Sequence, residues 1–130
     1  MWRIDDTTAT YGHAPNLWNS AKERLRAELW RTASARKTMT YSEAVASIRN
    51  LIVFGPHDHV FHEMLVQISV EEDANGRGML SAIVVHSDDG QPGKGFFDLA
   101  QKLDRDISDS LACWVREVNR LYEEAAQVSA

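Results

Sequence analysis

Apolar residues recur every three or four positions in three separate segments of the chain, and this period predicts a mainly helical fold. The segments are residues 16–36, 57–75 and 109–127. Charged side chains fill many of the intervening positions of the first and last segments, which is typical of helices that bury one face. A chain of 130 residues is long enough to pack such helices around one core, so we expect a single domain.

A shorter helix is predicted over residues 41–49 by the residues at its start. The Thr40 hydroxyl can accept a hydrogen bond from the third amide of the helix, and the Glu43 carboxylate can reach back to the amide of Thr40. This arrangement is a capping box. Gly55-Pro56 then separates this helix from the next one, and we expect Pro56 to be the first residue of that helix because proline is favoured there.

Residues 79–97 predict the β part of the fold. A short β-branched run, a Gly-rich turn and the residues GFF indicate a small β-hairpin, and a short helix is expected over 98–104. The order helix, short helix, helix, strand and turn is that of a winged helix. The predicted fold is therefore mainly α with a small β-hairpin, a winged-helix-like three-helix core plus two C-terminal helices. We expect residues 1–15 to form an N-terminal arm and residues 16–130 to form the domain.

Two stretches resemble the winged-helix half of alkyltransferase-like DNA proteins. They are TYSEAVASI and LSAIVVHSDDGQPGKGFF, and the resemblance spans residues 38–97. In that family a TYGELA-type capped helix precedes a recognition helix, and a short wing follows. The family's reactive Pro-Cys-His-Arg motif is absent and Cys113 lies in a later helix, so the resemblance implies the fold and no alkyl transfer. The run GRGMLSAIVVHSDDGQPGKGFF also resembles small uncharacterised bacterial domains.

Three histidines and two carboxylates lie within the eleven residues 55–65. His59, His62 and Glu63 share one face of the predicted helix, because side chains three and four positions apart are neighbours. A divalent metal could take these three residues together with His86, and three protein ligands with one open position suit a metal-dependent hydrolase. The spacing H-x-H-x-x-H differs from the H-E-x-x-H of known zinc sites. An ordinary helix with a histidine-rich face therefore remains the competing interpretation.

Charge is unevenly distributed along the chain, whose net charge is −5. Residues 1–50 carry eight Lys and Arg against five acids, whereas residues 51–130 carry six against fourteen. The predicted helix over 57–75 ends in three acids at 71–73 and contains no Lys or Arg before Arg77. Because acids repel phosphates, we expect this helix not to enter a DNA groove as a recognition helix does.

Basic side chains outside that helix are the candidates for contacting a partner protein or a nucleic acid. They are Arg24, Arg31, Lys37, Arg77 and Lys94. Lys94 lies between Gly93 and Gly95 without the spacing G-x-x-x-x-G-K-[ST] of a phosphate loop. We expect these two glycines to let a turn bend through positive φ angles.

Several function classes are disfavoured by what the sequence lacks. No stretch approaches the roughly 18 apolar residues of a membrane span, so we expect no membrane partner. The single cysteine, Cys113, excludes an internal disulfide and fits the cytoplasm. No G-x-S-x-G elbow marks a nucleophile, and no motif indicates a cofactor. We therefore expect no cofactor, and binding rather than catalysis.

The leading hypothesis is a non-enzymatic bacterial interaction or regulatory module that binds a partner protein, with a second copy of the chain as one candidate partner. A nucleic-acid-binding regulator that uses the basic first helix and the wing is the first alternative. A metal-dependent hydrolase built on the histidine cluster is the second alternative.

Overall fold

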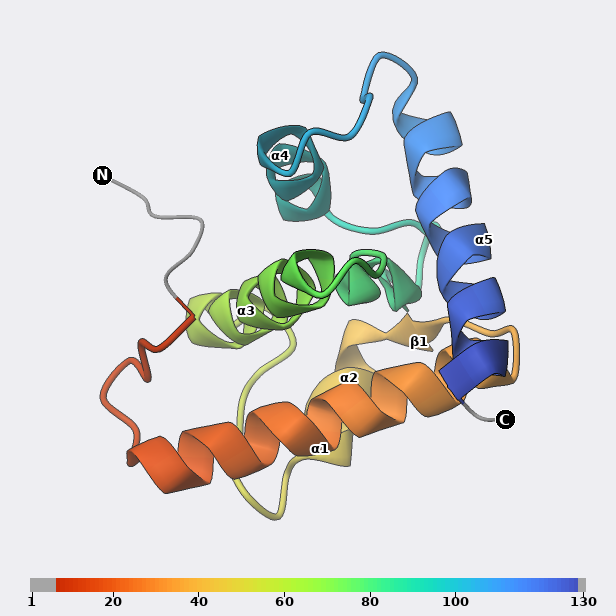
Figure 1. Cartoon of the computed structure of the whole chain (residues 1–130). Helices are drawn as coiled ribbons and strands as arrows, with labels where there is room; N and C mark the ends of the chain where they lie inside the picture. Colours follow the sequence, from red (N-terminus) through yellow and green to blue (C-terminus); the bar gives the residue numbers. More distant parts are fainter. Residues whose placement is uncertain (1–6, 129–130) are drawn as a thin grey trace.

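The computed structural model describes residues 7–128, and this part of the chain is mainly α-helical with a small β element (Figure 1). The mainly α class that the apolar period predicts is thus confirmed. In chain order the elements are α1 (Pro15–Ser34), β1 (Met39–Thr40), α2 (Tyr41–Ser47), α3 (His59–Ala74), the 3₁₀ helix η1 (Leu80–Ile83), β2 (Val84–Val85), α4 (Lys94–Lys102) and α5 (Ser110–Val128). No helix among the described residues is long and apolar enough to cross a membrane.

The short helix η1 lies at the centre of the packing. It contacts α1, α3 and α5, and all four of its residues, Leu80–Ile83, are buried. Trp18, Leu25 and Leu29 of α1 belong to the same fully buried core. In Figure 1, α1 and α3 lie one above the other and α5 crosses near the end of α1. The apolar run around η1 is therefore explained by burial on every side.

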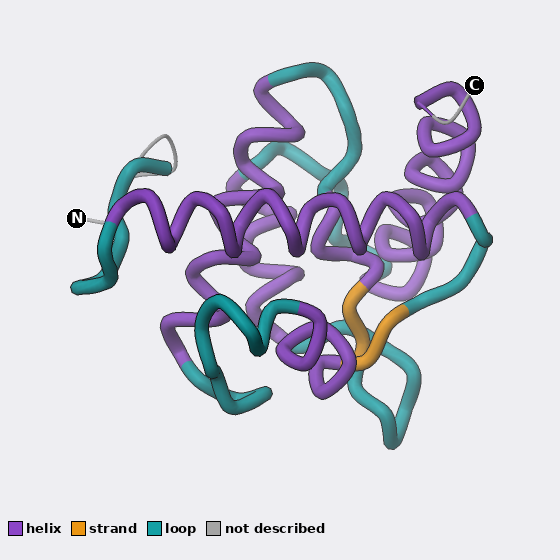
Figure 2. Tube along the Cα trace, turned by 90° about the horizontal axis from the view of Figure 1, so that it is seen from below, coloured by secondary structure: helices purple, strands orange, loops and turns teal. Residues whose placement is uncertain are grey.

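The β-hairpin predicted over residues 79–97 is wrong. Val84–Val85 pairs in parallel with Met39–Thr40, with Met39 opposite Val84 and Thr40 opposite Val85 (Figure 2). A parallel pair needs a crossover connection, and α2, α3 and η1 supply it. The residues GFF, expected as a return strand, lie inside α4, so the helix predicted over 98–104 begins at Lys94 instead. A short apolar run does not by itself distinguish a strand from a buried helical turn.

At the starts of α2 and α3, side chains accept hydrogen bonds from backbone amides that have no partner within the helix. The predicted capping box is present: the Glu43 amide donates to the Thr40 hydroxyl at 3.1 Å, and the Thr40 amide donates to the Glu43 carboxylate at 2.9 Å. The start of α3 differs from the prediction, because Asp58 is its N-cap and accepts from the Val60 amide at 2.9 Å. Pro56 therefore lies before the helix rather than in its first turn.

The segment before α1 packs against the helices. The Gln67 amide group donates to the carbonyl of Ala9 at 2.7 Å, and the Tyr11 hydroxyl donates to Glu63 at 2.9 Å. These contacts join residues predicted as an arm to the inner helix α3. Trp2, a further aromatic residue of the predicted arm, lies outside the described residues.

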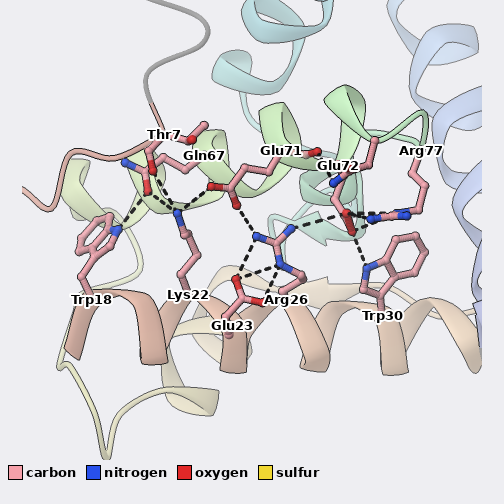
Figure 3. A network of polar contacts seen from close by, with 11 residues as sticks. Thr7, Trp18, Lys22, Glu23, Arg26, Trp30, Gln67, Glu71, Glu72 and Arg77 are labelled. Carbon is pink, nitrogen blue, oxygen red and sulfur yellow. Dashed lines mark hydrogen bonds and ion pairs between the residues drawn. The ribbon is translucent and has the colours of Figure 1, made fainter. Parts of the chain in front are cut away.

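A ladder of polar contacts joins α1 to α3 (Figure 3). The buried Lys22 ammonium donates to Gln67 at 3.1 Å and to Glu71 at 2.9 Å. Glu71 also accepts from Arg26, and the Trp18 indole donates to Gln67 at 3.0 Å. A cation buried in this way needs partners on several sides, and α3 provides them.

Glu72 lies at the end of this ladder and is buried, with 1 % of its surface exposed. It accepts from the Trp30 indole at 2.8 Å and from Arg77 at 2.9 Å. Asp73 is bound by Arg105. The acids at the end of α3 are therefore paired with cations of neighbouring segments and are not free to face a nucleic acid.

The sequence predicted that acidic charge keeps α3 out of a DNA groove, but in the structure its burial gives a different reason. Of its sixteen residues, only His59 and Ala74 are exposed. A helix that enters a DNA groove must present a face to solvent. In this protein α3 is an inner helix, and its packing rather than its charge keeps it from a groove.

Candidate functional site

The four predicted metal ligands do not form one cluster. His59 lies 3.6 Å from the Glu63 carboxylate, and its own side chain is 84 % exposed. His62 instead stacks on the Tyr41 ring with centroids 5.2 Å apart, and His86 contacts the same ring at 4.8 Å. Among the described residues no group of three or more His, Cys, Asp or Glu side chains is arranged to hold a metal ion.

A pocket of about 200 Å³ lies where the two imidazoles meet Tyr41. Its walls come from the start of α2, from α3, from η1, from the segment after β2 and from the start of α4. The lining residues are Tyr41, His62, Leu65, Val66, Ser81, His86, Gly93, Lys94, Gly95, Phe96 and Leu99. The lining combines apolar side chains with the hydroxyl-bearing residues Tyr41 and Ser81, two histidines and Lys94.

The parallel strand pair brings the distant parts of this pocket together. Because Thr40 lies opposite Val85, the next residues on each chain segment, Tyr41 and His86, become neighbours. The capping box fixes Tyr41 as the first residue of α2. The amide of Gly93 then approaches the Tyr41 hydroxyl at 3.4 Å.

A short loop returns the chain from β2 to the pocket. The His86 amide donates to the carbonyl of Gln91 at 2.9 Å, and the Gly90 amide donates to the carbonyl of His86 at 2.9 Å. Gly90 takes a φ of 67°, as expected for a glycine in a turn. Gly93 has a φ of −75°, so the expectation of a positive φ at this position is wrong.

Gly93 lies where its neighbours leave little room for a side chain. A Cβ atom on Gly93 would lie 3.1 Å from Nε2 of His86 and 3.4 Å from the Tyr41 hydroxyl. In contrast, a Cβ atom on Gly95 would meet nothing within 4 Å. The absence of a side chain at Gly93 allows the backbone at the start of α4 to line the pocket.

Two of the five predicted basic contact residues lie together at the end of α1. Arg31 and Lys37 line a surface depression of about 270 Å³. The other lining residues are Thr32, Ala35, Thr38, Met39 and Glu43. Arg31 also forms an ion pair with Glu28 at 2.9 Å. This corner presents two cations beside the partly buried Met39.

The other three predicted basic residues have separate surroundings. Arg77 is held by the buried Glu72, and Lys94 lines the Tyr41 pocket. Arg24 is exposed on α1, seven residues before Arg31 and therefore on a similar side of the helix. The structure thus places Arg77 in an ion pair with the buried Glu72, and Lys94 in a different pocket from Arg31 and Lys37.

Two residues of the Tyr41 pocket were missed by sequence reasoning. Tyr41 reads as an inward-facing residue of a capped helix, and Ser81 as part of an apolar run. The signals that do point to the pocket are His62, His86 and Lys94, which the sequence singled out for other roles. Their convergence depends on contacts between segments far apart in the chain.

No family model matches the chain, and no curated protein or solved structure is found to be similar to it. The functional argument therefore depends on the geometry of the described residues.

Proposed function

We propose that the protein is a non-enzymatic interaction module of bacterial type, which binds an acidic segment of a partner protein at the C-terminal end of α1. The observation that carries this proposal is that Arg31 and Lys37 line one depression beside Met39. In a chain with a net charge of −5, a local pair of exposed cations is suited to select an acidic partner.

The depression combines features that a protein segment can use. Its cations can pair with carboxylates, and Met39 and Ala35 offer apolar surface to a neighbouring side chain. Glu43 also lines the depression, but its carboxylate is already hydrogen-bonded to the Thr40 amide at 2.9 Å. Arg24 extends the basic surface along the exposed side of α1. We place this interaction in the cytoplasm, because the only cysteine, Cys113, is a buried free thiol.

The alternatives have weaker support. A nucleic-acid site made from all five predicted basic residues would need Arg77 and Lys94 to act with Arg31, but these lie in other surroundings. A metal-dependent hydrolase would need its four ligands to converge, and His62 and His86 instead contact Tyr41.

The proposal is tested with a fluorescein-labelled ten-residue peptide rich in Glu and containing one Leu, by fluorescence anisotropy. We expect K37E to weaken binding roughly five- to ten-fold, because a favourable charge becomes a repulsive one. R49E is the matched control, since Arg49 is also exposed but does not line the depression. Its affinity should stay within about two-fold of the unmodified protein.

Two results would overturn this function. The first is that the acidic peptide does not bind at millimolar concentration, or that its affinity for K37E equals its affinity for the unmodified protein. The second is a DNA duplex of twenty base pairs that binds more tightly than the peptide, with an affinity that falls by about 0.9 log units per tenfold rise in salt for each phosphate contacted. That outcome would favour the nucleic-acid alternative.

A further inference from the structure

We infer that the pocket beside Tyr41 is a second binding site, for a small organic carboxylate whose apolar part is about the size of a benzene ring. This site shares no lining residue with the depression at Arg31 and Lys37. The inference goes beyond the proposed function, and each can fail without the other.

The Tyr41 hydroxyl proton is the first reason to expect a ligand. The Tyr41 side chain is 8 % exposed, and its oxygen accepts a long hydrogen bond from the Gly93 amide. Burial raises the pKa of Tyr41, and the Gly93 hydrogen bond offsets part of this rise, so the hydroxyl keeps its proton at neutral pH. Among the residues that the structure describes, no group accepts that proton. A buried donor normally has an acceptor.

Ser81 supplies a second hydroxyl group to the pocket. The Ser81 amide donates to the Ser69 hydroxyl at 3.0 Å, and the Ser69 hydroxyl donates to the Ser81 hydroxyl at 2.7 Å. Ser69 is completely buried and Ser81 is 9 % exposed. The Ser81 hydroxyl also lines the pocket, where a ligand could share a hydrogen bond with it.

Charge in the pocket favours an anion. None of its lining residues is an acid, although the chain contains 19 acids. Lys94, an exposed residue, lines the pocket, and the nine-residue helix α4 begins here without a side-chain cap. The amides of Lys94 and Gly95 have no acceptor among the described residues, and the start of a helix carries partial positive charge. Asp98, one turn further along α4, lines a neighbouring depression instead.

The apolar lining residues and the volume limit the size of the ligand. Leu65, Val66, Phe96 and Leu99 form an apolar surface that a fully polar ion such as phosphate would leave unused. A volume of about 200 Å³ is slightly larger than the ~150 Å³ cavity that holds benzene in an engineered protein, and smaller than the ~300 Å³ at which drug-sized sites begin. A carboxylate of the size of benzoate or hexanoate fits both limits.

The test is an NMR titration of the ¹⁵N-labelled chain with sodium benzoate. We expect saturable shifts at the amides of Gly93, Lys94 and Gly95. Benzamide has the same shape without the charge, and it should bind at least about ten-fold more weakly because it loses the charge-assisted hydrogen bonds. Inorganic phosphate should also bind more weakly than benzoate.

Matched variants connect binding to the pocket. Y41F removes the hydroxyl and keeps the ring that contacts both imidazoles, and we expect it to lower benzoate affinity about ten-fold. Y122F makes the same change in α5, outside the pocket, and should leave the affinity unchanged. S81A should weaken binding in the same direction as Y41F. K37E should not alter benzoate binding, and Y41F should not alter binding of the acidic peptide, which separates this site from the proposed function.

The inference is overturned if the shifts do not saturate below tens of millimolar, or if benzamide or phosphate binds as tightly as benzoate. Equal affinity of Y41F and Y122F would also overturn it. The comparison of benzoate with benzamide uses the unmodified protein, so it decides the question even if a variant fails to fold.

Discussion

Gly93 shows how a single missing side chain shapes this protein. Its backbone lies against His86 and Tyr41, and the space a Cβ atom would occupy is within 3.1 Å of the His86 imidazole. Its φ of −75° is open to any residue. Gly93 is thus favoured by close approach, whereas Gly90, with its φ of 67°, is suited to its turn by backbone conformation.

Replacement of Gly93 by alanine tests this difference at the residue scale. We expect G93A to lower the free energy of unfolding by about 1 kcal/mol, because the His86 side chain must move to admit the new methyl group. G95A is the control: its Cβ would meet nothing within 4 Å in α4, and alanine is the better helix former, so it should be neutral or stabilising by some tenths of a kcal/mol. Urea unfolding measures both. If G93A is as stable as G95A, the close approach does not constrain this position.

At the scale of elements, the start of α2 is where the sequence and the structure agree best. Thr40 and Glu43 form the capping box that their spacing predicts, because both partners lie within four residues of each other. Thr40 also belongs to β1, so the same residue ends a strand and starts a helix. The position of Tyr41 in the pocket depends on this junction.

Removal of the Thr40 hydroxyl is expected to weaken the junction. T40A should lower the free energy of unfolding by about 1 kcal/mol, because the Glu43 amide loses its acceptor at the start of α2. T38A removes a hydroxyl from the exposed Thr38 two residues earlier and should change stability by less than about 0.5 kcal/mol. Chemical denaturation followed by circular dichroism distinguishes the two. Equal stabilities would show that the capping box contributes little to the fold.

At the scale of the whole molecule, charges hold α1 against α3. Lys22 and Arg26 of α1 both bind Glu71, and a second group of cations surrounds Glu72. Partial burial raises the pKa of Glu71, but hydrogen bonds from Lys22 and Arg26 and the charges of these two residues outweigh it, so the pKa lies below its ordinary value. The contact between the two helices is therefore expected to depend on pH.

The sign of that dependence follows from the lowered pKa. A carboxyl group with a lower pKa in the folded state stabilises the protein above its unfolded pKa, and this contribution is lost as the pH falls through the folded value. We expect E71Q to be less stable than the unmodified protein by about 1–3 kcal/mol at pH 7. The difference should shrink as the pH falls below the ordinary value of 4.5.

Urea unfolding of both proteins between pH 3 and pH 7 checks this expectation, with E123Q as the control because Glu123 is exposed on α5. A difference between E71Q and the unmodified protein that stays constant down to pH 3 would contradict the role assigned to the Glu71 charge.

The long helices and the capping box could be predicted because their signals are local: the apolar period and the cap both act within a few residues. The hairpin could not be predicted correctly, because a buried apolar run looks the same whether it forms a strand or a 3₁₀ turn. The pocket beside Tyr41 depended on tertiary contacts, whereas the depression at Arg31 and Lys37 is lined by residues that are close in the sequence. The pocket exists because residues 39–40 pair with residues 84–85 across three intervening elements. This pairing brings Tyr41, His86 and Gly93 together. The pattern of residues along the sequence does not reveal contacts between segments that lie so far apart in the chain.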